Sequence, residues 1–148
     1  MQESYGKHLW VDGLVSKRIP VSPILIDPKS LGDFLIEVVE SISMRILKGP
    51  FIAFEEDKSL LDNGPSGVII LYESHIALHA YPARRAFFLD LFSCKPFSEI
   101  KVIDLLKDKL YMSYYTKNIM HRGLHWDTTI DIKKERDKRE NLNMPIQL

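Results

Sequence analysis

The sequence contains a single cysteine, Cys94, among its 148 residues. One thiol cannot form a disulfide within the chain, which excludes a disulfide-stabilised fold and suits a reducing compartment. The chain also lacks a net charge, because 20 Lys and Arg balance 20 Asp and Glu. Without an overall positive charge it does not fit a protein that neutralises nucleic-acid phosphates, so we expect no nucleic-acid partner.

Long hydrophobic runs are also absent. No apolar run approaches the about 20 residues that a membrane-spanning helix needs, and the N-terminal segment lacks the apolar region of a signal peptide. We therefore expect no membrane partner and a soluble, cytoplasmic protein. The length predicts a single domain over residues 1–148, in which the charged segment at residues 131–148 forms a solvated tail.

Apolar periodicity predicts two amphipathic helices. The first begins with Ser30 as its N-cap, continues through Ile46 and ends at Gly49-Pro50. The second begins near Pro96, and its apolar face comprises Phe97, Ile100, Ile103, Leu106 and Leu110. Strands are expected at residues 7–15, 68–73, 76–82, 84–94 and 111–120, and residues 51–57 are a candidate for another.

These elements predict an α+β fold, a two-layer α/β sandwich with the order strand–helix–strand–strand–strand–helix–strand. Strands joined by short hairpins favour a mostly antiparallel sheet, with both helices on one face. The other face then needs a cover, and a second copy of the chain is the simplest one. We therefore expect a homodimer.

Residues 66–82, SGVIILYESHIALHAYP, place Glu73-Ser74-His75 where a two-residue hairpin would favour Asn-Gly or Asp-Gly. His79 follows Ser74 by five residues and Cys94 follows it by twenty. A serine, a histidine and a cysteine at one end of a sheet can supply a nucleophile, a base and an acid. The same residues can equally be a turn serine, a core histidine and a buried thiol. No metal site is expected.

The chain resembles the short prokaryotic S-adenosylmethionine decarboxylases, which are pyruvoyl-dependent enzymes made as self-cleaving proenzymes. The resemblance lies in GKHL at residues 6–9, PSGVIILYESHIALHAYP at residues 65–82 and LDLFSC at residues 89–94. It implies that the Glu73–Ser74 peptide bond is cut, giving fragments 1–73 and 74–148. It also implies that Ser74 becomes a pyruvoyl group, the only cofactor, whose ketone forms a Schiff base with a small-molecule substrate and accepts electrons.

The resemblance further implies a role for each matched residue. Ser74 attacks the Glu73 carbonyl, and His79 and Ser66 assist this processing. Cys94 donates the proton that replaces carbon dioxide. Phe51 or Phe54 stacks on the adenine of the substrate, and Glu73 contributes to substrate binding.

One motif departs from the family. The family's Trp-Pro-Glu is Tyr81-Pro82-Ala83 here, so the glutamate that holds the ribose is missing. The expected function is S-adenosylmethionine decarboxylation in polyamine (spermidine) synthesis. One alternative is the same chemistry on arginine or ornithine, whose distal cation needs an acid such as those at residues 55–57 or Asp62. The other is a non-catalytic regulatory relative.

Overall fold

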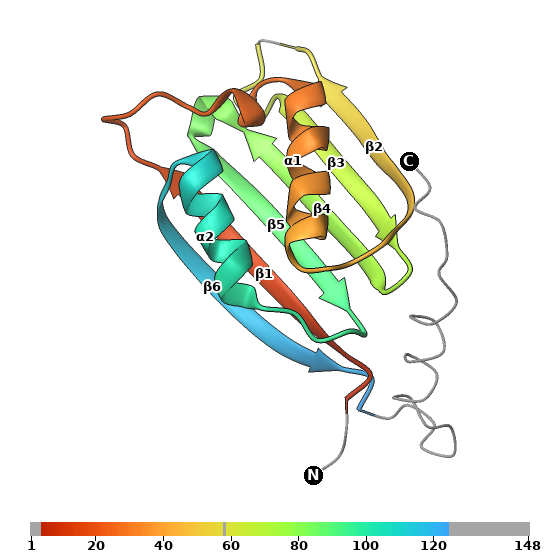
Figure 1. Ribbon diagram of the computed structural model, residues 1–148. Coiled ribbons are helices and arrows are strands. Elements are labelled where there is room, and N and C mark those ends of the chain that lie inside the picture. The colour runs from red at the N-terminus through yellow and green to blue at the C-terminus, as the bar shows by residue number, and fades with distance from the viewer. Residues whose placement is uncertain (1–3, 58, 125–148) are drawn as a thin grey trace.

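A computed structural model describes residues 4–57 and 59–124, which form a six-stranded sheet with two α-helices packed on one face (Figure 1). The strands are β1 (Gly6–Val15), β2 (Ile46–Glu55), β3 (Gly64–Leu71), β4 (Ser74–Tyr81), β5 (Ala86–Ser93) and β6 (Met112–Arg122). The α-helices are α1 (Pro28–Ser41) and α2 (Glu99–Leu110). The predicted α+β sandwich is confirmed.

The strands lie in the order β2-β3-β4-β5-β1-β6, and every neighbouring pair is antiparallel. Helix α1 lies over β2 and β3, and α2 lies toward β6 (Figure 1). Between the helices the chain has four strands rather than the predicted three, because residues 46–55 form β2.

Helix α1 is displaced toward the N-terminus from its predicted range. It begins at Pro28 because the Asp27 carboxylate caps it, accepting a hydrogen bond from the Ser30 N–H at 2.8 Å. It ends at Ser41, and Ser43 follows with a left-handed φ of +58°, which a helix cannot contain. The prediction that the helix continues through Ile46 is therefore wrong.

Helix α2 follows its prediction more closely. Ser98 caps it by accepting a hydrogen bond from the Lys101 N–H at 3.3 Å. Ile100, predicted to lie on the apolar face, is 68% exposed, and Val102 is buried in its place. The apolar stripe is therefore rotated slightly around the helix from the predicted one.

The hydrophobic core lies between the sheet and the helices. It contains Leu35 and Val38 from α1, Leu106 from α2, and Leu78 and Leu89 from the sheet. No described helix covers the opposite face of the sheet, which we call the open face. It carries exposed apolar side chains at alternate strand positions, namely Leu14, Phe51, Ile70, Phe88 and Met120.

Two further predictions concern the C-terminal tail and membrane-spanning helices. The charged tail predicted at residues 131–148 lies outside them. Within the described part of the chain, no helix is both long and apolar enough to cross a membrane.

Candidate active site

Ser74 lies at a tight hairpin turn. Strand β3 ends at Leu71 and β4 begins at Ser74, so Tyr72 and Glu73 form the two-residue connection. The φ angle of Ser74 is +147°, outside the regions that residues with a Cβ atom normally occupy. Such backbone strain persists only where the surroundings impose it, and it concentrates at functional sites.

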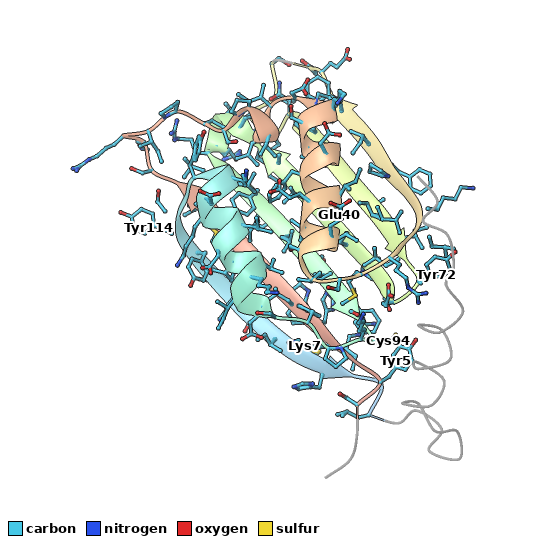
Figure 2. All side chains as sticks on the ribbon, viewed as in Figure 1. Tyr5, Lys7, Glu40, Tyr72, Cys94 and Tyr114 are labelled. Carbon is cyan, nitrogen blue, oxygen red and sulfur yellow. The ribbon has the colours of Figure 1, made fainter. Side chains whose placement is uncertain are left out.

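The peptide group between Glu73 and Ser74 is held from the neighbouring strand. The Cys94 N–H donates a hydrogen bond to the Glu73 carbonyl oxygen at 2.9 Å. Strand pairing places Ser74 opposite Ser93, directly before Cys94. Figure 2 shows Tyr72, the residue before Glu73, at the same end of the molecule as Cys94. The structure thus brings Glu73, Ser74 and Cys94 together, as the sequence predicts.

The side chain of Glu73 is 5% exposed and bound to Arg45. One carboxylate oxygen accepts a hydrogen bond from the Arg45 Nε at 3.1 Å, and the other accepts one from the Arg45 backbone N–H at 3.1 Å. Both carboxylate oxygens of Glu73 are thus bound to Arg45. The contribution of Glu73 to substrate binding stays a prediction. Sequence analysis missed Arg45 because it assigned residue 45 to the end of a helix.

Cys94 is buried, with 3% of its surface exposed, and borders a hollow of about 230 Å³. Tyr5, Lys7, Lys95 and His121 also line this hollow, and Tyr5 lies beside Cys94 in Figure 2. Cys94 therefore borders a small cavity and also contacts the strained turn through its backbone N–H. Within the described ranges, no three His, Cys, Asp or Glu side chains gather as a metal site.

His79 does not reach this end of the sheet within one chain. It pairs with Ser66 across β3 and β4, five residues along β4 from Ser74. At about 3.3 Å per residue, five residues along the strand correspond to about 16 Å. The expectation that the serine, the histidine and the cysteine converge within the chain is therefore wrong for His79.

His79 instead forms a pair with Ser66 on the open face. The Ser66 Oγ and the His79 Nδ1 are 2.9 Å apart, within hydrogen-bonding distance. The pair borders a hollow of about 420 Å³, which Phe51 also lines. Phe54 lies three residues further along β2 than Phe51, opposite Pro65, and does not line this hollow. Of the two candidate phenylalanines, Phe51 is thus the one next to a predicted site residue.

A further polar cluster lies on the open face near Ser74. His8 from β1 hydrogen-bonds to Asp90 from β5, and its ring centroid is 6.3 Å from that of His75. The Arg122 guanidinium lies 4.4 Å from the centre of the Phe92 ring. Burial lowers the pKa of His75, and His8 lowers it further, while Asp90 opposes the shift. Sequence analysis missed this cluster because its members come from four strands.

Comparison with known proteins identifies the family to which the chain belongs. A sequence model of the S-adenosylmethionine decarboxylase family matches residues 13–123. A relative from Hydrogenobaculum sp. (strain Y04AAS1), described as an S-adenosylmethionine decarboxylase proenzyme, is 26% identical over 130 residues, covering 86% of this chain and 89% of the relative. A Saccharolobus islandicus protein of the same description is 32% identical over 102 residues, covering 68% of this chain and 77% of the relative.

The fold agrees with this match. The crystal structure of the adenosylmethionine decarboxylase from Aquifex aeolicus VF5 superimposes with a TM-score of 0.67 at 19% identity, covering 82% of this chain and 92% of that one. The chain belongs to the S-adenosylmethionine decarboxylase family, which is a family of carboxy-lyases.

Proposed function

We propose that the chain is a proenzyme that cuts its own Glu73–Ser74 peptide bond and then decarboxylates S-adenosylmethionine for polyamine synthesis. One observation carries the proposal. The carbonyl of Glu73 is hydrogen-bonded to the Cys94 N–H at 2.9 Å, and the serine that follows it has a strained φ of +147°. A polarised carbonyl beside a constrained hydroxyl-bearing residue is the arrangement that an acyl shift requires.

The proposed cleavage uses groups that the chain itself supplies. The Ser74 Oγ attacks the Glu73 carbonyl carbon and loses its proton to a base, and the Cys94 N–H stabilises the oxyanion. The C–N bond then breaks as its nitrogen takes up a proton, which leaves an ester. Loss of the Ser74 α-proton expels Glu73 as a carboxylate and leaves dehydroalanine. Water then replaces the nitrogen, ammonia is released, and residue 74 becomes a pyruvoyl group.

The residues around Ser74 fit such a group. It would begin fragment 74–148, next to the hollow bordered by Cys94. Once present, a pyruvoyl ketone supplies the electron sink that decarboxylation of an α-amino acid needs. The Cys94 thiol is then the proton donor to the carbon that has lost carbon dioxide, because it is held at the wall of the hollow, where bulk water has little access.

His79 and Ser66 fit the proposal through a second copy of the chain. An imidazole can accept and return protons near neutral pH, which suits both the attack and the elimination. Since His79 lies about 16 Å from Ser74 along its own strand, we place it in the site of a homodimer partner that covers the open face. Phe51 would enter the same site beside His79 and supply an aromatic surface for the adenine.

Two observations favour a second candidate substrate. Ala83 lies exposed in the short helix Pro82–Arg84, where the family's ribose-binding glutamate is missing. The acidic loop after β2 lies at the Ser66–His79 end of the sheet, because Glu55 pairs with Gly64. In a homodimer this loop would approach the site that His79 serves, and it would pair with the distal cation of arginine or ornithine.

Two measurements test the proposal. Intact mass after expression should show fragments 1–73 and 74–148, the second blocked at its N-terminus, and a Ser74→Ala variant should remain one chain. Matched incubations with carboxyl-labelled S-adenosylmethionine, arginine and ornithine should release carbon dioxide from S-adenosylmethionine. Release from arginine or ornithine alone would select the second candidate. An uncut, inactive wild-type chain would leave the non-catalytic alternative.

A further inference from the structure

Glu73, the residue whose carbonyl would be attacked, is held at three points. Its carbonyl oxygen accepts the Cys94 N–H, and its two carboxylate oxygens accept the Nε and the backbone N–H of Arg45. The Tyr72 N–H in turn donates to the Arg45 carbonyl at 3.1 Å. The guanidinium also lies 5.0 Å from the centre of the Tyr72 ring. Arg45 therefore binds both residues of the hairpin turn.

The segment that carries Arg45 is itself fixed to the rest of the site. The Met44 N–H donates to the Val39 carbonyl at the end of α1, at 3.0 Å. On the other side, the Lys95 Nζ donates to the Ser43 carbonyl at 3.0 Å. Arg45 is thus held between α1 and the residue that follows Cys94, so its position relative to the turn is defined by both.

The ion pair also matters for the charges that cleavage creates. The Arg45 and Glu73 side chains are 19% and 5% exposed, so little water screens them. During cleavage, negative charge develops on the Glu73 carbonyl oxygen and later on its α-carboxylate. A second carboxylate on the same residue, left without a cation, would oppose both, because like charges repel strongly where water is excluded.

Resting on the proposed self-cleavage, we propose that Arg45 is a positioning residue for it. Its guanidinium neutralises the Glu73 side chain and, with its backbone N–H, fixes the Glu73 carbonyl between the Cys94 N–H and the Ser74 hydroxyl. After cleavage the same contacts hold the new C-terminus of fragment 1–73. Arg45 acts through Glu73 and does not contact the substrate.

The test measures the first-order rate of self-cleavage of freshly made protein by gel densitometry. Arg45→Met should slow cleavage by about tenfold or more, the size of effect expected when a reacting group loses its alignment. Arg45→Lys, which keeps the charge, should recover part of the rate. Adding Glu73→Gln to Arg45→Met should raise the rate above that of Arg45→Met alone, because it removes the uncompensated charge.

The controls separate positioning from general stability. Lys109→Met removes a cation from the ion pair with Glu37, at 3.7 Å between the helices, and should leave the cleavage rate unchanged. Wild-type cleavage by Arg45→Met would overturn the inference and leave the proposed function intact. Equal slowing in all three Arg45 variants, matched by a fall in thermal midpoint, would also overturn it, because this indicates a purely structural role. An uncut wild-type chain would instead contradict the proposed function.

Discussion

At the scale of single residues, the protonation of His75 links the region of Ser74 to pH. Burial lowers the pKa of His75 from 6.5, and His8 lowers it further. The unfolded chain therefore binds a proton at this residue at a higher pH than the folded chain does. The contribution of His75 to the free energy of unfolding should fall as the pH drops below about 6.5, and this contribution should level off below the lowered pKa of the folded state.

Urea denaturation at a series of pH values checks this prediction. A His75→Gln variant should show a smaller loss of stability between pH 7 and pH 5 than the wild type. His121→Gln, which removes an exposed imidazole, provides the matched control and should follow the wild-type curve. Parallel curves for His75→Gln and the wild type would contradict the lowered pKa.

The positions of individual site residues follow from the sequence only where the separation along the chain is short or the strand pairing is simple. Glu73, Ser74 and Cys94 meet as predicted, because two neighbouring hairpin strands bring their ends together. The position of His79 follows from the pairing register of β4, and this register places His79 away from Ser74. Arg45 has no sequence signal, because its partner Glu73 is 28 residues away.

At the scale of secondary-structure elements, Gly13 of β1 leaves space for an aromatic ring of the neighbouring strand β5. It pairs with the fully buried Phe87 of β5, and an added Cβ atom would lie 2.2 Å from the Phe87 ring. Gly13→Ala should therefore lower the free energy of unfolding by about 1–3 kcal/mol, the usual cost of overpacking a core.

A double-mutant cycle isolates this contact. Phe87→Leu alone leaves a cavity, but it makes room for the methyl group of Gly13→Ala, so the combined loss of stability should be smaller than the sum of the two. Urea denaturation of the four proteins measures the coupling. Strict additivity would show that the two positions do not restrict each other.

Element types were predictable from the sequence, but their ends were not. The apolar spacing of Leu31, Phe34, Leu35 and Val38 correctly identifies α1. The same spacing continues through Ile42 and Ile46, so periodicity alone extends the helix too far. The left-handed Ser43 and the pairing of Ile46 with Leu71 decide that β2 begins there, and neither is visible in a helical pattern.

At the scale of the whole molecule, the open face and the position of His79 suggest the same assembly. The exposed apolar side chains Phe51, Ile70 and Phe88 lie on the face that no described helix covers. A second copy packed there would bury them and would bring a second His79 to this side of the sheet. Sedimentation should therefore give a dimer, and replacing Ile70 and Phe88 with Lys should weaken both the dimer and cleavage.

Complementation between two inactive chains tests whether His79 acts on its partner. A Ser74→Ala chain lacks the hydroxyl that attacks the Glu73 carbonyl, so it stays uncut, and a His79→Ala chain should cut itself slowly or not at all. In a mixed dimer the Ser74→Ala chain supplies an intact His79 to the Ser74 of the other, so co-expression should restore cleavage of the His79→Ala chain. Distinct tags on the two chains identify which one is cut.

If isolated mixed dimers leave the His79→Ala chain intact, His79 does not act across the interface. If that chain is cut at the wild-type rate when expressed alone, the imidazole is not required.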